Sequence, residues 1–245
     1  MMNEELTALQ ELEEAKKILD SAGIRPDQEA WRRLAVYHAM LLEWNGRMDL
    51  TNVPRQEMAL RHYGDSLLPL ACEGWFPPDA RLIDVGSGAG FPGMPLAIVR
   101  PDLRVTLLDA QRKRCDFLQA VVGQAGLRNV TVIHGRAEDA ARGDLRESMD
   151  IAAARAVAPL NVLLEYLLPF VRQGGRALCW KGPAVMEERD AGGRTARMLG
   201  GREDTLVRLP IPEREHYVLS YRKTGKTADP YPRKSGIPSR QPLAR

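Results

Sequence analysis

Cysteine is scarce in this chain of 245 residues: Cys72, Cys115 and Cys179 are the three present. They lie far apart and form no CxxC pair, which argues against a disulfide framework or a structural zinc and favours a reducing compartment. No apolar run approaches the roughly 18 residues of a membrane span, and the acid-rich first thirty residues contain no apolar signal-peptide core. We therefore expect a cytoplasmic protein without membrane or metal partners, in which Cys115 and Cys179 are packed thiols.

Charges of opposite sign gather at the two ends of the chain. Residues 1–30 carry a net charge of −5, whereas residues 221–245 carry +6. A basic terminal arm is the usual electrostatic footprint of a polyanionic partner, although a solubilising tail has the same composition. The arm also contains four prolines, which disfavour a helix and predict an extended, partly mobile segment.

The first 78 residues predict helices. Apolar residues recur at helical spacing from Trp31 to Leu42, and His38 lies on this stripe, where a packed core histidine is expected. More helix is expected over residues 57–72, and Pro77 with Pro78 marks a boundary. We therefore expect an N-terminal helical extension over residues 1–78.

Short apolar runs alternate with helical patterns over residues 79–222. Strands are predicted at residues 81–85, 104–108, 130–134, 150–154, 176–180, 205–209 and 217–221, and helices at residues 94–100, 112–125 and 160–170, with another ending near Leu199. This alternation is typical of right-handed βαβ units. We expect an α/β fold whose mainly parallel, seven-stranded sheet is flanked by helices, followed by the basic arm at residues 223–245.

A glycine loop follows the first of these strands, where the ten residues from Asp84 read Asp-Val-Gly-Ser-Gly-Ala-Gly-Phe-Pro-Gly. Glycines at a strand-to-helix turn let the backbone approach a ligand, and the helix behind them offers free N–H groups. Asp109 ends the next strand, where a carboxylate can accept both hydroxyls of a ribose. Gly86, Gly88, Gly90 and Asp109 therefore predict a nucleoside site, the alternative being a tight turn with a surface aspartate.

Two cofactor classes fit such a loop. Gly88, Gly90 and Gly93 match the GxGxxG pattern of dinucleotide folds, but Asp84 would repel an anionic pyrophosphate. The acid-x-Gly-x-Gly-x-Gly run resembles the first motif of class I S-adenosylmethionine-dependent methyltransferases, which have a Rossmann-like fold and whose acid helps to orient the ammonium group of the cofactor. We therefore expect S-adenosylmethionine. The turn at residues 135–139 would meet its adenine, or is a solvated charged loop.

The sequence lacks the signatures by which two classes of methyl-acceptor site are recognised. The fourth strand runs into Ala-Arg-Ala-Val-Ala-Pro at residues 154–159, without the Asn/Asp-Pro-Pro-aromatic signature of exocyclic-amine methyltransferases, and neither Cys115 nor Cys179 has the setting of a nucleophile. The 7-nitrogen of guanine carries a lone pair and no proton, so its methylation needs alignment with the sulfonium methyl rather than a general base. No catalytic residue is assigned, and several acceptors are compatible.

These residues together resemble one family, the bacterial small-subunit rRNA guanine-N(7) methyltransferases known as RsmG or GidB. The resemblance rests on DVGSGAGFPGMP at residues 84–95, HGRAE at 134–138, ARAVA at 154–158, Lys181-Gly182, Trp44-Asn45, Arg61-His62 and YPRK at 231–234. It implies methylation of a guanine in the 530 loop of 16S rRNA, either as naked RNA or in a small ribosomal subunit precursor, by an enzyme that we expect to be a monomer.

The resemblance also implies roles for individual residues. Cofactor contacts would fall on Gly86, Phe91, Ala137, Glu138 and Arg155, in addition to Asp109. RNA contacts are expected at Arg61, His62, Lys181, Arg233 and Lys234, although a helix cap or a solvated charge would explain some of these residues equally well. The chain departs from the family at Asp49, where Asn is usual, and at Tyr63-Gly64, where two apolar residues are usual, so packing after His62 is expected to differ.

Other functions fit parts of the same pattern. The same cofactor could serve a small-molecule or protein acceptor, or the fold could belong to a non-catalytic RNA-binding factor of ribosome assembly. An NAD-dependent dehydrogenase is opposed by Asp84 and by the lack of an evident catalytic pair.

Overall fold

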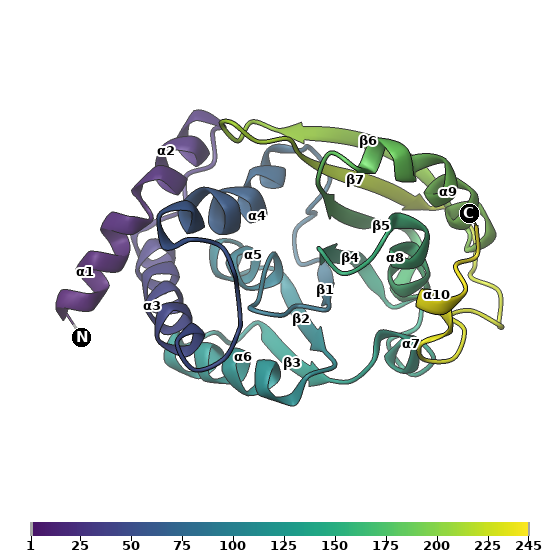
Figure 1. Cartoon of the computed structure of the whole chain (residues 1–245), viewed down its shortest axis with the longest axis horizontal. Coiled ribbons are helices and arrows are strands. Elements are labelled where there is room, and N and C mark those ends of the chain that lie inside the picture. Colours follow the sequence, from purple (N-terminus) through teal and green to yellow (C-terminus); the bar gives the residue numbers. More distant parts are fainter. Residues whose placement is uncertain (1, 245) are drawn as a thin grey trace.

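Seven strands form one sheet in the computed structural model, which describes residues 2–244 (Figure 1). The strands are β1 (Arg81–Val85), β2 (Arg104–Asp109), β3 (Val130–His134), β4 (Met149–Arg155), β5 (Val171–Lys181), β6 (Gly201–Leu209) and β7 (His216–Lys223). Their order is β3-β2-β1-β4-β5-β7-β6, and β7 runs antiparallel to the other six strands. The predicted α/β fold with a mainly parallel seven-stranded sheet is confirmed. The strand order reverses between β1 and β4, where such sheets bind ligands at their carboxyl edge.

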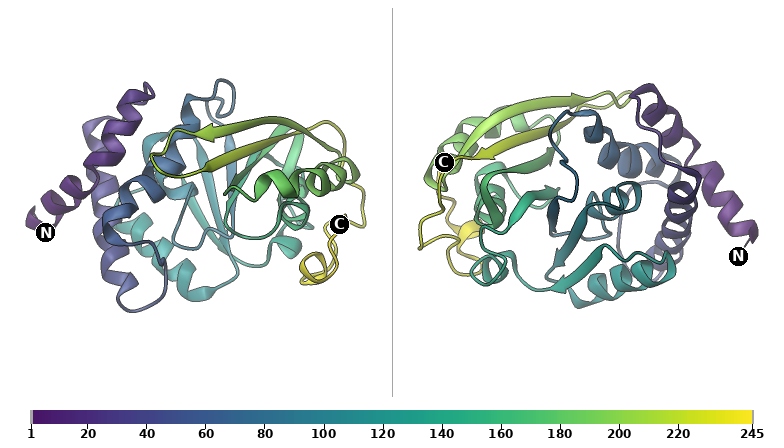
Figure 2. Two further views of the ribbon diagram at one scale, coloured as in Figure 1. Left: turned by 45° about the horizontal axis from the view of Figure 1, so that its top comes forward. Right: turned by 180° about the vertical axis from the view of Figure 1, so that it is seen from behind.

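Helices cover both faces of the sheet (Figures 1 and 2). One face carries α3 (Gln28–Asn45), α5 (Gly93–Val99) and α6 (Arg112–Gln124), with α1 (Met2–Glu11) and α2 (Glu13–Ser21) packed outside them. The other face carries α7 (Ala137–Ala140), α8 (Leu160–Leu167) and α9 (Val185–Met198). Successive strand residues serve opposite faces, since Leu82 belongs to the first core and Ile83 to the second. Within residues 2–244 no helix is both long and apolar enough to cross a membrane.

Helix α3 is the central element of the N-terminal region. Its start is capped by Asp27, whose carboxylate accepts a hydrogen bond from the backbone N–H of Ala30 at 2.7 Å. The predicted apolar stripe is buried along it. His38 is 1% exposed and is hydrogen-bonded to the Tyr63 hydroxyl and to Glu11, so the prediction of a packed core histidine is confirmed.

The helix expected over residues 57–72 takes the form of a series of short helices. The 3-10 turn η1 (Arg55–Glu57) leads to the π-helix η2 (Ala59–Gly64), then to α4 (Asp65–Leu67) and to the 3-10 turn η3 (Leu68–Ala71). Pro69 lacks a backbone N–H, which prevents an α-helix from continuing through η3. Wide π turns occur frequently at functional sites, and this one carries Arg61 and His62.

Among the remaining elements, β6 begins at Gly201 rather than at residue 205, and α7 forms where only a turn was predicted. Two further differences have a local cause. β5 begins at Val171 rather than at residue 176 and includes Gly174, whose φ of 86° coincides with a pairing irregularity between β4 and β5. The helix predicted over residues 160–170 ends as α8 at Leu167, because Pro169 forces the chain into the 3-10 turn η4 (Leu168–Phe170). Cys115 and Cys179 are buried and unpaired, as predicted for packed thiols.

The C-terminal arm is packed on the molecule, so the prediction of an extended, partly mobile segment is wrong for residues 224–244. It runs beside α7 and α8 and contains the short helix α10 (Ile237–Arg240) (Figures 1 and 2). Proline does not prevent this helix, because Pro238 lies in the first turn, where a missing N–H costs nothing.

Candidate functional site

A cavity of about 480 Å³ opens at the carboxyl edge of the sheet, beside the glycine loop. Its lining includes five predicted cofactor residues, namely Gly86, Gly88, Phe91, Asp109 and Arg155, together with the predicted RNA residue His62. Gly90, Ala137 and Glu138 are absent from the lining. The structure thus gathers residues from the loop, from the ends of β2 and β4, and from η2, a segment far away in the sequence.

Close packing explains why two glycines of the loop cannot carry a side chain. Gly86 has a φ of 72°, and a Cβ there would lie 2.9 Å from the Val157 side chain. Gly90 has a φ of 105°, and a Cβ there would lie 2.9 Å from the Tyr37 hydroxyl. That hydroxyl donates a hydrogen bond to the carbonyl of Ala89 at 2.5 Å. Gly90 therefore serves to seat the loop on α3, which makes the N-terminal extension part of the site.

Asp84 lies beneath the loop and is completely buried. Its Oδ2 accepts a hydrogen bond from the Gly93 N–H at 2.9 Å, while its Oδ1 has no hydrogen-bond partner among the described residues. Burial raises the pKa of Asp84 to about 7. Asp84 does not line the cavity, so its visible role is to hold the start of α5, and the expected contact with a cofactor ammonium group stays a prediction.

Asp109 is placed to receive a polar ligand at the end of β2. It is 4% exposed; its Oδ2 accepts from the N–H of Gly88 and its Oδ1 from that of Gln111, both at 2.8 Å. Each carboxylate oxygen has a second lone pair, so these bonds leave capacity for ribose hydroxyls. They also fix the carboxylate against the loop, which couples the loop conformation to the proposed ribose contact.

Arg155 joins η2 to the end of β4. Its guanidinium donates to the carbonyl of Arg61 at 2.8 Å, to Asp65 Oδ2 at 2.9 Å and to His62 Nδ1 at 2.9 Å, and it lies 4.9 Å from the centre of the Phe91 ring. The guanidinium group can only donate, so Nδ1 of His62 accepts and Nε2 donates to the Thr51 hydroxyl at 2.8 Å.

His62 forms an apolar wall of the cavity rather than a cationic contact. Its ring stacks on Phe91 with centroids 4.3 Å apart, and burial, with the nearby charges of Arg155 and Arg61, lowers the pKa of His62 to about 2. The ring is therefore neutral. A neutral, 5% exposed ring is unsuited to a phosphate, so any contact of His62 with RNA would be with a base.

A second cavity of about 350 Å³ adjoins the first and shares His62, Arg155 and Ala156 with it. Ala156 has a φ of 56°, a left-handed conformation that is uncommon outside glycine and often occurs at functional sites. The second cavity adds Val53, Arg61, Asp65, Trp180, Lys181, Gly182 and His216. Arg61 and Lys181, both predicted RNA residues, therefore lie together here. Asp65 and His216 were missed in the sequence, since their partners are far away along the chain.

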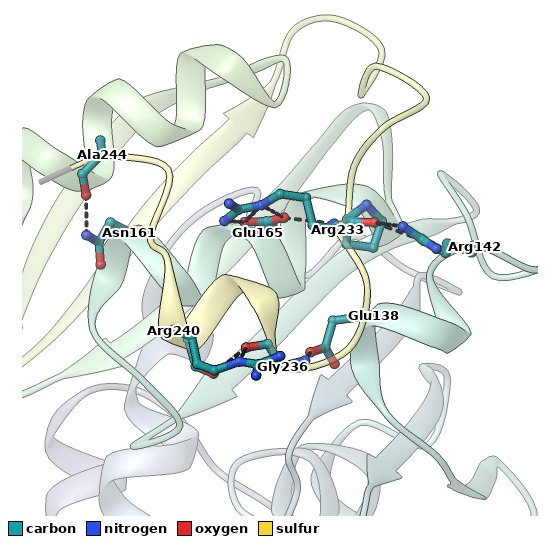
Figure 3. Close-up of polar contacts among 10 residues, drawn as sticks. Glu138, Arg142, Asn161, Glu165, Arg233, Gly236, Arg240 and Ala244 are labelled. Carbon is teal, nitrogen blue, oxygen red and sulfur yellow. Dashed lines mark hydrogen bonds and ion pairs between the residues drawn. The ribbon is translucent and has the colours of Figure 1, made fainter.

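Of the remaining predicted residues, Ala137 is partly buried at the start of α7, and the others lie in the contact between the arm and the core, which Figure 3 shows in close-up. Glu165 is fully buried and binds Arg233 through two parallel hydrogen bonds, at 2.9 Å and 2.7 Å. Glu138 accepts a hydrogen bond from the N–H of Gly236 at 2.8 Å. One oxygen of the Glu138 carboxylate thus holds the arm, the expected contact with an adenine stays a prediction, and Arg233 is committed to an ion pair. Lys234 is exposed beside them.

The first cavity fits S-adenosylmethionine by its chemistry. Its volume lies within the roughly 300–1,000 Å³ of small-molecule sites, and the carboxylate of Asp109 suits ribose hydroxyls. Because Gly86 and Gly88 have no side chains, the ligand has room beside the backbone of the loop. Across the part of the chain that the structure describes, no group of three or more His, Cys, Asp or Glu residues is arranged to hold a metal ion.

Comparison with known proteins gives consistent matches. The chain matches the family described as "GidB: rRNA small subunit methyltransferase G" over residues 30–217. The protein named ribosomal RNA small subunit methyltransferase G from Alkaliphilus oremlandii is 43% identical over 215 residues, covering 86% of this chain and 90% of the relative. Its namesake from Alkaliphilus metalliredigens is 41% identical over 238 residues, covering 94% and 99%.

Solved structures share the fold at low sequence identity. MtNAS in complex with MTA and tNA has a TM-score of 0.56 and 19% identity, covering 87% of this chain and 82% of that one. M. jannaschii TYW2 in complex with AdoMet has a TM-score of 0.50 and 17% identity, covering 61% and 72%. The class I methyltransferase fold expected from the glycine loop is thereby confirmed.

Proposed function

This chain belongs to the rRNA small subunit methyltransferase G family, and we propose that it methylates the 7-nitrogen of one guanine in the 530 loop of 16S rRNA. Membership of the family makes it an S-adenosylmethionine-dependent rRNA methyltransferase; the atom and the loop are the proposed part. The observation that carries the proposal is the pair of adjoining cavities that share His62, Arg155 and Ala156. One suits the cofactor, and the other is large enough for a purine that has left its stack.

The cofactor would lie along the first cavity. Asp109 would accept the ribose hydroxyls, and Gly86 and Gly88 would let the backbone pass close to it. When bound, S-adenosylmethionine supplies an electrophilic methyl group attached to a positively charged sulfur. His62, Phe91 and Arg155 would form the wall between the two cavities and hold the reacting groups in line.

The reaction needs no proton transfer from this chain. The guanine 7-nitrogen would form the bond to the methyl carbon with its own lone pair, and the electrons of the broken carbon–sulfur bond would leave with the sulfur. The positive charge passes to the purine, where the nearby carboxylate of Asp65 would stabilise it. The neutral state of His62 agrees with a site that works by alignment, because a neutral imidazole adds no charge that would repel the purinium.

The proposed substrate is rRNA alone or in an assembling small subunit, and the enzyme would act as a monomer in the cytoplasm. Exposed basic residues, among them Lys234 on the arm, would contact phosphates around the target. Arg61 would act nearer the base, because it lines the second cavity and is already paired with Glu57 at 3.0 Å.

Transfer of labelled methyl from S-adenosylmethionine to small-subunit RNA that lacks the modification tests the proposal, with the product nucleoside identified and mapped. We expect 7-methylguanosine at one site in the 530 loop. Transfer only to a partly assembled subunit would place the recognition elements in the particle. A different methylated nucleoside would overturn the proposed atom. Cofactor binding without modification of either RNA form would favour a small-molecule or protein acceptor, and RNA binding without turnover would favour an assembly factor.

A further inference from the structure

His216 is a polar residue of the second cavity for which alignment of a methyl acceptor gives no role. It is the first residue of β7 and its side chain is 27% exposed. Its Nδ1 lies 2.9 Å from Oδ1 of Asp65, a carboxylate that is only 2% exposed. A general base would be unnecessary, since the 7-nitrogen of guanine carries no proton. The histidine therefore needs another explanation.

Asp65 determines which nitrogen of His216 can accept a hydrogen bond. Its other oxygen, Oδ2, accepts from the Arg155 guanidinium at 2.9 Å, so Asp65 acts as an acceptor towards both partners. Nδ1 of His216 must then be the donor towards Asp65, and in the neutral ring Nε2 is left with a lone pair. A buried carboxylate behind a histidine commonly fixes tautomer and orientation in this way.

Lys181 offers the complementary group. Its Nζ donates to the carbonyl of Ala158 at 3.1 Å and is paired with Glu188 at 2.6 Å. An ammonium group has three donors, so one more can be directed to a ligand in the cavity. Lys181 pairs with Tyr217 between β5 and β7, and the alternation of side chains then places His216 on the opposite face of the sheet. The donor and the acceptor thus reach the cavity from opposite faces.

Resting on the proposed function, we propose that His216 and Lys181 read the Watson–Crick edge of the target guanine. Lys181 donates to the 6-oxygen, and Nε2 of His216 accepts from the 2-amino group at the other end of that edge. Adenine fails at both positions, because it has an amino group in place of the 6-oxygen and no 2-amino group. Asp65 and Arg155 are positioning residues, which hold His216 and connect it to the cofactor cavity.

Inosine in place of the target guanosine separates these contacts, because it lacks the 2-amino group and keeps the 7-nitrogen and 6-oxygen. Methyl incorporation would be measured on reconstituted small subunits. Their rRNA would be ligated from synthetic segments and would carry either guanosine or inosine at the target position. Wild type should prefer guanosine by about tenfold in kcat/KM, the size of one hydrogen bond in a desolvated site. His216→Phe, which keeps a ring of similar volume, and His216→Ala should each bring the ratio near one by lowering transfer to guanosine alone.

Matched variants distinguish recognition from a general loss of structure. Lys181→Met should lower transfer to both substrates equally, since both carry the 6-oxygen. His134→Ala, at an exposed position on β3 outside both cavities, should keep the preference. Cofactor affinity, measured by calorimetry, should be the same in wild type and in both His216 variants, because His216 does not line the first cavity.

The outcomes separate the two proposals. If either folded His216 variant still prefers guanosine by as much as wild type, the inference is overturned while the proposed function stands. If wild type forms no 7-methylguanosine, the proposed function fails and the inference fails with it.

Discussion

The guanidinium of Arg155 donates to the carboxylate of Asp65 at 2.9 Å, although the two residues are 90 positions apart in the sequence. Asp65 is 2% exposed and Arg155 is 17% exposed. The pair connects α4 to the end of β4 and lies where the two cavities meet. It therefore contributes both to the attachment of the N-terminal region and to the shape of the candidate active site.

Asp65→Ala should destabilise the protein strongly. The change leaves the Arg155 guanidinium and the His216 ring without their carboxylate, and breaking a buried pair on one side costs about 3–5 kcal/mol. Urea unfolding would measure the loss. The control is Glu43→Ala, which removes the exposed pair with Arg47 on the surface of α3 and should change the unfolding free energy by less than about 0.5 kcal/mol. Equal losses in the two variants would contradict a structural role for the Asp65 pair.

Asp109→Ala should weaken the binding of S-adenosylmethionine by about 1–3 kcal/mol, because it removes a charge-assisted acceptor from the ribose. The variant also frees the N–H of Gly88, so the glycine loop loses one of its anchors. Calorimetric titration would measure the affinity. Asp116→Ala, at an exposed position on α6, should bind the cofactor as wild type does. Unchanged affinity in a folded Asp109 variant would remove this residue from the site.

Glu165→Ala should release the C-terminal arm. It leaves the Arg233 guanidinium and backbone N–H without their acceptor on α8, and the expected destabilisation is about 3 kcal/mol. Limited proteolysis should then cut the chain after residue 223 sooner than in wild type. An arm that stays equally resistant to protease in the variant would show that the other contacts, such as Glu138 with Gly236, suffice to hold it.

Lys234→Ala should weaken RNA binding without changing stability. The lysine is exposed, so its contribution is electrostatic, and the slope of log affinity against log salt should fall by about one unit. Point substitution is a better test than deletion of residues 223–245, because Lys223 is buried and bonded to the carbonyl of Leu168. An unchanged salt slope would mean that Lys234 contacts no phosphate.

Most of the fold and about half of the site can be predicted from local sequence. The glycine loop and Asp109 could be predicted because the strand, the turn and the acid all lie within one βαβ unit, where spacing determines geometry. The cluster of Asp65, Arg155 and His216 could not, since Asp65 and His216 are 151 positions apart and meet only after folding. The packing of the arm could not be predicted either, because its net charge does not reveal that Arg233 pairs with Glu165 on the core. Glu165 offers a signal, because it is a single acid within the apolar run of residues 162–167 in α8 and a buried carboxylate requires a cation.

Stability should depend on pH through Asp84. Its pKa is about 7 in the folded protein, because the side chain is buried with one oxygen unpaired, and about 3.9 in the unfolded chain. Between these values the folded protein holds a proton that the unfolded chain releases, so the stability contributed by this group falls as pH rises from about 4 to 7 and is constant above that range.

Asp84→Asn removes the ionisation, while its side-chain oxygen can still accept from Gly93. Urea unfolding at a series of pH values should therefore show that the unfolding free energy of the Asn variant rises relative to that of wild type across that range. The rise should reach up to about 4 kcal/mol, at about 1.4 kcal/mol per pKa unit. Well below pH 4 the Asp84 carboxyl group of wild type is neutral in both the folded and the unfolded state, so the difference between the two proteins should become constant there and provides the internal control. A difference that does not change with pH would mean that the Asp84 carboxylate is ionised in the folded protein throughout, and that a charged group near it, such as Arg155, outweighs the burial.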